Sequence, residues 1–352
     1  MKRKILLFPV LIIILINSCS SGTDPEEKKS LRDYTWTADT LTTDQSVQTL
    51  MRSIWASSSN DIYVCGHNNS GIGNIWHYNG HKWSYIDDII RNDIGRLASL
   101  SNVHGTNENN VWLVGYNGVA NTDKKNSFIV QYNGQKWVEH KIIYGSAINW
   151  VYAASVNDVW ACGDDGITYH YNGSVWDIDT INVPVSGEAW FSLYSIVKVN
   201  NQVYCAGSRL EQGGFNKKNI FFKRENDNWV EVESYEENQG INWGTRLLVS
   251  TYKELYSIGS VGVHKWEGSQ WLKVFSSQFP LTWMADIGEN DVLITGGFGK
   301  IFHYNGADWK QFEQFENIDF IHSAVWRNDE EAFIVTLDLT GTPQTTIIWH
   351  GK

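Results

Sequence analysis

The chain is short of proline, cysteine and cations. Five Pro and four Cys occur among 352 residues, and 28 Lys and Arg stand against 39 Asp and Glu, which gives a formal charge of −11. An acidic protein repels phosphate backbones, so nucleic acid is not an expected partner. The sequence also contains no HExxH, no Gly-x-Ser-x-Gly and no phosphate-binding Gly-rich loop. We therefore expect neither a metal nor a cofactor.

Cysteine is too scarce and too regularly placed for a disulfide framework. Apart from Cys19, the chain has Cys65, Cys162 and Cys205, each one or two residues before a Gly in copies of one repeat. Three cysteines cannot all pair internally. Equivalent positions of different repeats are also expected to lie far apart. We predict that these three are buried small apolar residues.

A long apolar run occurs only once, at the start of the chain. Lys2, Arg3 and Lys4 precede apolar residues 5–16, which are too few to span a membrane comfortably but have the layout of a secretory signal. The run ends at Ile16-Asn17-Ser18-Cys19, which resembles a bacterial lipobox. This resemblance implies removal of residues 1–18, lipidation of Cys19 and a mature charge of −14, because cleavage removes three cations from −11. An ordinary secretory signal with an incidental Cys is the alternative.

The segment after Cys19 is polar. Residues 20–32 read SSGTDPEEKKSLR and contain too few apolar side chains to fold, so residues 19–32 are predicted to be a lipidated tether. An acidic stretch soon after the lipidated Cys resembles the surface-export signals of Bacteroidota lipoproteins. That resemblance implies an outer-membrane lipoprotein and leaves open whether it faces outward.

Two short phrases recur along the rest of the chain. The first is a turn followed by a strand: NDIYVCG at 60–66, NNVWLVG at 109–115, NDVWACG at 157–163, NQVYCAG at 201–207, KELYSIG at 253–259, NDVLITG at 290–296 and, more weakly, EEAFIVT at 330–336. The second is YNGHKW at 78–83, YNGQKW at 132–137, YNGSVW at 171–176 and YNGADW at 304–309. Asn-Gly tolerates the positive φ of tight hairpins, so the second phrase joins two strands.

Each unit therefore has four strands, which in the first unit are residues 53–57, 62–65, 75–78 and 83–86. Seven units in residues 33–352 give a period of about 46 residues, which predicts an all-β, seven-bladed β-propeller. A Trp begins the fourth strand at positions 83, 137, 176, 229, 271 and 309, and the last unit lacks this strand. Trp36 matches it, so we expect the N-terminal strand to complete the last blade and close the ring. We expect a monomer.

The repeats resemble two known propeller types. The Gly after the second strand, the Tyr and Trp that follow, and the pair Gly296-Gly297 are similar to kelch repeats. The Gly-x-x-Trp turn is similar to the tail of the Asp-box of sialidase-like propellers, although the Ser-x-Asp ahead of it is absent. The whole pattern resembles uncharacterised bacterial propeller lipoproteins of Bacteroidota type. Some of these are labelled glucosyltransferase, a name that no residue of this chain supports.

Three histidines, His77, His170 and His303, precede the Tyr-Asn-Gly phrase. They are symmetry-related copies on separate blades and should not converge on one metal, so a structural use is favoured. Asp164-Asp165-Gly166 lacks the alternate-acid spacing of a calcium loop and fits a polar turn better.

Tryptophan provides the candidate binding site. Four of the 18 Trp fall in connections between one blade and the next, on the face that also carries the long inserts, called here the loop-rich face. Exposed Trp faces suit sugar rings, peptide aromatics or cations, and variable loops on a rigid scaffold often bind ligands. Two of the four share an offset that would place them at the mouth of the central channel. The expected ligand-binding residues are Trp150, Trp190, Trp243 and Trp283, with His104, Arg246 and His322 on the same side. The alternative is that these Trp cap the apolar layer between blades.

Two functions remain open. The first is a non-catalytic envelope lipoprotein that binds a glycan or a protein through the loop-rich face. The second is a glycan-active enzyme, hydrolase or lyase, with acids such as Glu188, Asp286 and Glu211 near that face. A glycosidase needs two carboxylates at a defined separation, so the placement of these acids distinguishes the two functions.

Overall fold

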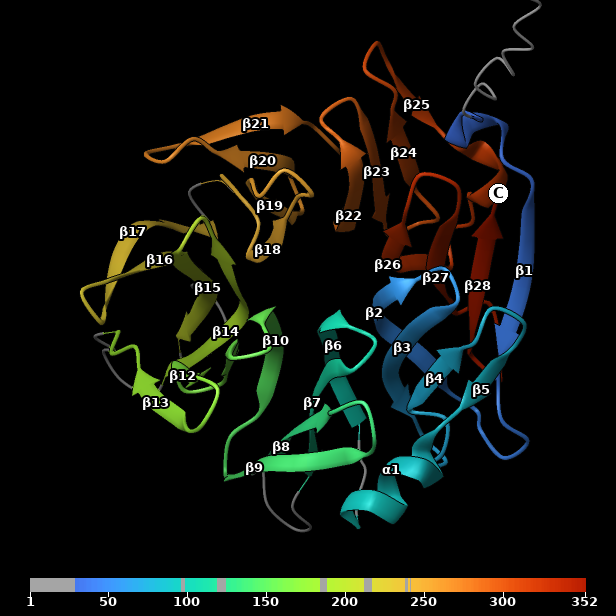
Figure 1. Cartoon of the computed structure of the whole chain (residues 1–352). Helices are drawn as coiled ribbons and strands as arrows, with labels where there is room; N and C mark the ends of the chain where they lie inside the picture. Colours follow the sequence, from blue (N-terminus) through green and yellow to red (C-terminus); the bar gives the residue numbers. More distant parts are fainter. Residues whose placement is uncertain are drawn as a thin grey trace, which may run out of the picture.

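A computed structural model describes residues 29–95, 99–118, 125–183, 189–211, 217–237, 240 and 242–352. The signal segment, Cys19 and Glu188 lie outside the described residues, as does the side chain of Glu211. Seven antiparallel sheets of four strands surround a central channel (Figure 1). The predicted seven-bladed, all-β propeller is confirmed.

The blades follow the chain in order, and each begins with its innermost strand. Blade 1 is β2 (Thr49–Ser58), β3 (Asp61–Asn68), β4 (Ile75–Tyr78) and β5 (Trp83–Tyr85). Blade 2 is β6 (Ser99–Asn107), β7 (Asn110–Gly118), β8 (Lys125–Tyr132) and β9 (Trp137–Tyr144). Blade 3 is β10 (Ile148–Ser155), β11 (Asp158–Gly163), β12 (Ile167–Tyr171) and β13 (Trp176–Thr180). Blade 4 is β14 (Ala189–Val199), β15 (Gln202–Glu211), β16 (Lys217–Glu225) and β17 (Asn228–Glu236).

The last three blades include the closure of the ring. Blade 5 is β18 (Arg246–Val249), β19 (Leu255–Gly259), β20 (Gly262–Trp266) and β21 (Trp271–Phe275). Blade 6 is β22 (Leu281–Gly288), β23 (Asp291–Gly296), β24 (Ile301–Tyr304) and β25 (Trp309–Gln311). Blade 7 is β26 (Phe320–Arg327), β27 (Ala332–Asp338), β28 (Thr345–Gly351) and, as its outer strand, β1 (Trp36–Leu41). Trp36 pairs with Gly351, so closure by the N-terminal strand is confirmed.

Contacts with the propeller start before residue 33. The short 3₁₀ turn η1 (Leu31–Asp33) buries Leu31. Arg32 donates from Nε to His303 Nδ1 at 3.2 Å and forms an ion pair with Asp308 at 2.8 Å. Residues 29–32 were assigned to the tether from the sequence, but they contact blade 6. Leu31 packs there against apolar core residues such as Leu293 and Ile301.

The YNGxxW phrase forms the turn of a β-hairpin. Its Asn, its Gly and its Tyr–Trp contact each stabilise this turn. In blade 1, Asn79 Oδ1 accepts from the backbone N–H groups of His81 and Lys82, both at 3.1 Å. Gly80 has φ +86°, and Tyr78 packs on Trp83 with ring centroids 5.2 Å apart. A Cβ on Gly80 would lie 2.6 Å from Asn60, which belongs to the other repeated phrase. The two phrases are thus one structural unit, repeated in blades 2, 3 and 6.

Side chains at the channel link each innermost strand to the next blade. In β2 the hydroxyl of Ser53 accepts from Val103 N at 3.2 Å. The other six links follow the same principle, with a side chain of one innermost strand bonded to the backbone of the next. They are Asn102–Val151 N, Asn149–Leu193 O, Ser195–Leu247 N, Arg246–Thr282 O, Thr282–His322 O and Ser323–Met51 O. Buried backbone groups at the axis are thereby satisfied around the whole ring.

The apolar core fills the spaces between blades. Cys65, Cys162 and Cys205 are free and fully buried, as predicted. The expectation that they lie far apart is wrong for two of them. Cys162 and Cys205 lie in one core cluster and make a thiol contact, because consecutive blades face each other at this depth.

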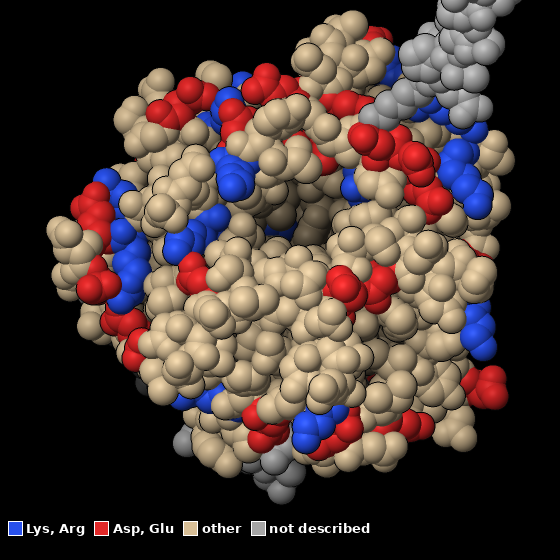
Figure 2. Space-filling view, viewed as in Figure 1, with Lys and Arg blue, Asp and Glu red and all other residues tan. Residues whose placement is uncertain are grey.

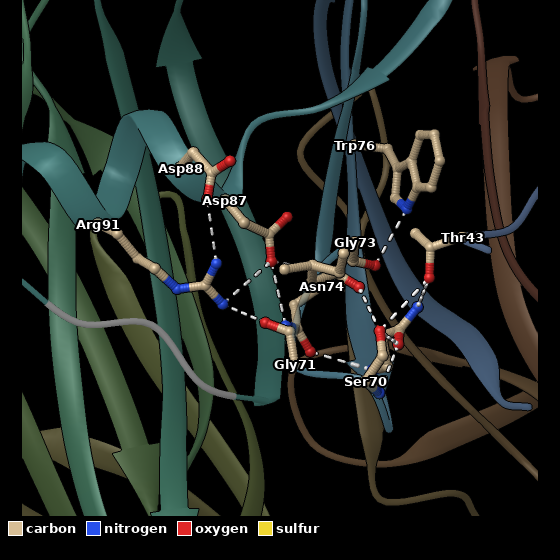
Figure 3. A network of polar contacts seen from close by, with 11 residues as sticks. Thr43, Ser70, Gly71, Gly73, Asn74, Trp76, Asp87, Asp88 and Arg91 are labelled. Carbon is tan, nitrogen blue, oxygen red and sulfur yellow. Dashed lines mark hydrogen bonds and ion pairs between the residues drawn. The ribbon is translucent and has the colours of Figure 1, made fainter. Parts of the chain in front are cut away.

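One helix lies in an insert that sequence analysis treated as irregular. Helix α1 (Asp87–Ile94) sits at the edge of the disc beside blades 1 and 2 (Figure 1). Buried Asp87 accepts from Asn74 N at 3.0 Å and Asn74 Nδ2 at 3.1 Å, and Arg91 pairs with Asp88 at 3.3 Å (Figure 3). Arg91 also donates to the carbonyl of Gly71. These contacts fix the loop between β3 and β4.

Candidate functional site

Two tryptophans close the central channel. Trp150 of β10 and Trp283 of β22 come from blades 3 and 6, and their ring centroids are 5.6 Å apart. The Arg246 guanidinium lies 5.6 Å from the Trp150 ring and 5.1 Å from the Trp283 ring, within cation–π range. Arg246 also donates to Thr282 O at 3.0 Å, toward the loop-rich face. Burial lowers the pKa of Arg246 to about 10, with Arg52 adding to the effect, so it remains a cation at neutral pH.

The other side of this pair is a cavity, called here the cup. It has a volume of about 450 Å³ and is lined by one residue from the same level of each innermost strand. These are Trp55, His104, Tyr152, Val197, Leu248, Ala285 and Trp326. Thr251, Lys253, Asp286 and Arg327 also line it, at or after the ends of innermost strands. The cup therefore opens on the face of the short turns, called here the tight-turn face; Figure 2 shows a hollow at the centre of the disc.

His104 is a neutral donor in the wall of the cup. Its Nδ1 accepts from Ala153 N at 3.1 Å, which places the ring proton on Nε2. Its ring centroid lies 4.7 Å from that of Tyr152. Burial lowers the pKa of His104 to about 4, so the ring carries no charge at neutral pH.

Three residues lie elsewhere than expected from the sequence. Trp150 and Trp283 were expected at the channel mouth on the loop-rich face, and His104 was expected on the same side. Trp150 and Trp283 lie inside innermost strands instead, and a β-bulge just before each turns its side chain into the channel. The structure therefore brings Trp150, Trp283, Arg246 and His104 together in the channel.

Trp190 lies apart from this group and is exposed. Its side chain is 78% exposed, the highest value of any Trp in the chain. It stands on β14 at the loop-rich face with Tyr194, while the intervening Phe191 and Leu193 face the core. Beside them, Ser192 Oγ donates to Asp164 Oδ1 at 2.9 Å, and Asn149 Nδ2 donates to the same oxygen at 3.1 Å. The start of β14 therefore presents two exposed aromatic side chains with polar groups between them.

Trp243 and His322 are buried. Trp243 has no exposed surface, packs 5.9 Å from both Phe221 and Trp271, and donates from Nε1 to Glu233 at 3.1 Å. His322 is bonded to Thr336 at 2.6 Å, and burial lowers its pKa to about 4. Trp243 therefore caps the apolar layer between blades, which was the alternative stated from the sequence.

No sequence motif marks the aliphatic residues of the loop-rich face, so they were not predicted. Among the described residues, exposed apolar side chains in the loops and strands of that face include Val47, Tyr85, Ile89, Tyr144, Trp190, Tyr194, Phe298 and Ile318. Two isolated β-bridges, Asp164 with Ser192 and Gly297 with Ile321, join loops of this face to the next innermost strand. The apolar residues thus stand on a braced surface.

The repeated histidines have local partners. His77, His170 and His303 bond to Asp61, Asp158 and Asp291 at 2.7, 2.9 and 2.7 Å respectively. Each Asp belongs to the turn of the other repeated phrase. The described residues hold no group of three or more His, Cys, Asp or Glu placed to bind a metal ion. In the same part of the chain, no helix is long and apolar enough to cross a membrane.

One of the three candidate acids can be placed. Asp286 was expected near the loop-rich face, but β22 carries it to the other end, at the rim of the cup. It accepts from Thr251 Oγ1 at 2.8 Å and from Thr251 N at 3.1 Å. Burial raises the pKa of Asp286, and these hydrogen bonds oppose the change.

Comparison with known proteins identifies the fold. No family model matches the chain, and no curated protein does. Among solved structures, YCF48 bound to D1 peptide aligns with a TM-score of 0.60 at 13% identity, covering 90% of this chain and 97% of that one. The extracellular domain of a protein described as a one-component system of B. thetaiotaomicron aligns with a TM-score of 0.57 at 12% identity, covering 88% of this chain and 39% of that one. The WD40 propeller domain of Doa1 aligns with a TM-score of 0.55 at 9% identity, covering 91% and 96%. These likenesses show a shared propeller fold.

Proposed function

We propose that this protein is a non-catalytic lipoprotein of the cell envelope that binds a protein partner through its loop-rich face. The observation that carries the proposal is Trp190, which exposes 78% of its side chain in a chain whose other Trp are buried or partly buried. Exposed aromatic side chains on a rigid strand are typical anchors of protein interfaces.

Other exposed side chains of the loop-rich face favour a protein over a glycan. Sugar rings stack on aromatic faces, whereas protein interfaces also bury aliphatic side chains. Ile318 is 74% exposed and Ile89 is 55% exposed on the same face as Trp190. Among the structures of the same fold, YCF48 was solved with a bound peptide, and two others are extracellular domains of B. thetaiotaomicron proteins. A glycan ligand is the second candidate, supported by the exposed rings of Trp190 and Tyr194 and by the polar groups of Ser192 and Asp164 between them.

The location follows from the N-terminal sequence. The basic start, the apolar run and the lipobox-like Ile16-Asn17-Ser18-Cys19 support lipidation of Cys19 and attachment to the outer membrane. Cells fed a palmitate analogue should label the wild-type protein, and Cys19→Ser should remove both the label and the membrane attachment. A labelled C19S variant would contradict the anchor.

The ligand class can be tested with Trp190 as the reporter. Solubilised envelope proteins of the source cells are added to the mature lipoprotein in detergent, and tryptophan emission is followed. Binding should shift the emission, and both Trp190→Ala and protease treatment of the extract should abolish the shift. A shift that survives protease but is lost after periodate treatment would establish a glycan ligand, and released products would establish an enzyme.

A further inference from the structure

A second cavity lies between blades 5 and 6, next to the cup. This groove has a volume of about 440 Å³. It shares two lining residues with the cup, Met284 and Asp286 of β22. It exists because the innermost strand of blade 5, β18, has only four residues, against eight in β22. The short β18 therefore leaves a space beside β22 that a longer innermost strand would fill.

Apolar and aromatic side chains line the walls of the groove, and several of them are exposed to solvent. Leu272 and Val274 of β21 are 50% and 41% exposed, and Tyr252, at the turn after β18, is 59% exposed. Deeper in the groove, Met284 and Ile294 are buried in the shared core. Tyr304 and Trp309 complete the opposite wall. A groove of this kind fits an extended chain whose side chains alternate between wall and solvent.

The charges of the groove are mainly negative. Four acids line it, Glu254, Glu267, Asp286 and Glu289, against one base, Lys265. Lys265 is already bonded to Glu254 at 2.6 Å and lies 3.8 Å from Glu267. Glu289 has no hydrogen-bond or ion-pair partner within the part of the chain that the structure describes. The negative field also acts on neighbouring groups: burial raises the pKa of Tyr256, and Glu254, Asp286 and Glu289 raise it further.

We propose that the groove and the cup together bind an extended cationic peptide segment on the tight-turn face. An apolar or aromatic side chain of the peptide enters the cup between Trp55 and Trp326, above the Trp150–Trp283 floor. A Lys or Arg side chain of the same peptide lies in the groove against Asp286 and Glu289. The site is on the face opposite Trp190 and does not depend on the proposed function.

The chemistry of the cup and of the groove determines which peptide side chain each of them binds. The depth of the cup is aromatic, with Lys253, Asp286 and Arg327 toward its rim, and His104 offers a neutral donor in its wall, so the cup accepts an uncharged side chain. The groove has four acids against one Lys, so it accepts the cation, and the attraction should weaken as salt screens it. Because Asp286 lies in both compartments, the two peptide residues lie close together in the peptide.

Fluorescein-labelled peptides can test the site by anisotropy, with the mature lipoprotein in detergent. The probes are acetylated and amidated pentapeptides that contain Phe-Ala-Lys, Phe-Ala-Glu or Ala-Ala-Lys at the centre. We expect Phe-Ala-Lys to bind at least about tenfold more tightly than the other two, and this difference to shrink at high salt. Equal binding of Phe-Ala-Lys and Phe-Ala-Glu, or no binding of any probe, would overturn the proposal.

Two charge-reversal variants, one in the groove and one outside it, serve as test and control. Glu289→Lys should weaken Phe-Ala-Lys binding at least about tenfold. Glu330→Lys makes the same change at an exposed acid of blade 7, on the same face but outside the groove, and should change binding less than about twofold. Trp190→Ala should leave binding unchanged, which separates this site from the loop-rich face. A Glu289→Lys protein that binds like wild type would contradict the assignment of the cation to the groove.

Discussion

Gly173 illustrates how little freedom the YNGxxW phrase has at the level of single residues. Its φ is +93°, and a Cβ there would lie 2.8 Å from Asn157 of the other phrase. Both the backbone conformation and the packing therefore require glycine. Gly173→Ala should lower the free energy of unfolding by about 1–3 kcal/mol, measured by urea denaturation. Gly341→Ala is the control, because a Cβ on Gly341 meets nothing within 4 Å; equal losses for both variants would contradict the explanation.

Buried histidines should make the propeller sensitive to mild acid. His264 and His322 are buried, and burial lowers the pKa of each from 6.5 to about 4, with Lys273 adding to the effect at His264. The folded protein keeps them neutral, while the unfolded chain takes up protons below pH 6.5. Stability is therefore full above that pH and is lost as the pH falls from 6.5 toward 4, by about 2 kcal/mol per histidine at pH 5. Asp291 does not contribute in this window: burial would raise its pKa, but His303 and Arg327 hold it at about 2.

His264→Leu isolates this effect. Neither ring nitrogen of His264 has a hydrogen-bond partner among the described residues, and the ring is 2% exposed. Leu should leave stability at pH 7 equal or higher, because it removes unpaired polar atoms from the core. It should also reduce the loss of stability between pH 7 and pH 5, followed by thermal unfolding at both values. An unchanged pH dependence would show that His264 is not one of the groups responsible.

The candidate tryptophans differ in burial, so their replacement by Ala should change stability by different amounts. Trp243→Ala removes a side chain with no exposed surface and should cost about 3–5 kcal/mol. Trp190→Ala removes one that is 78% exposed and should change stability by less than about 0.5 kcal/mol. Urea unfolding of the two variants checks both values. Similar losses for both would contradict the placement of Trp190 on the surface.

Among the elements, β1 is the one on which closure of the ring depends. Trp36 packs against Phe315 at 5.0 Å and its strand covers β28 along six residue pairs. Without β1, β28 becomes an open edge that invites pairing with other molecules. A chain that begins at residue 42 should aggregate, whereas one that begins at residue 29 should remain soluble and monomeric in size-exclusion chromatography. A soluble, folded chain from residue 42 would contradict this role of β1.

The strands were the most predictable elements and α1 the least. The repeated phrases mark one strand start each, and the expected strand at 75–78 coincides with β4. Signals for α1 were present, with Asp87 and Asp88 in the first turn, Arg91 in the last turn and Gly95 after it. They were overlooked because an eight-residue helix in an insert shows little periodicity. The shared offset of Trp150 and Trp283 in their repeats indicated a position at the central channel, but not their depth in it. The cup itself could not be predicted, because its wall takes one residue from each of seven innermost strands.

At the scale of the whole molecule, the propeller presents two different surfaces. The Trp150–Trp283 pair lies across the channel, and the cup beside it opens on the tight-turn face. The loop-rich face carries exposed apolar side chains, among them Trp190 and Tyr194. The ring of hydrogen bonds between innermost strands holds both surfaces on one rigid scaffold. Two partners on opposite faces are therefore compatible with one fold.

The measurement that tests the proposed function most directly is site-specific crosslinking in living cells. A photo-reactive amino acid replaces Trp190 on the loop-rich face or, as the control, Val175, which is 56% exposed in the turn between β12 and β13 on the opposite face. We predict a discrete crosslinked protein band from position 190 that is absent from position 175. No band from position 190, or the same bands from both positions, would contradict binding of a protein partner through the loop-rich face.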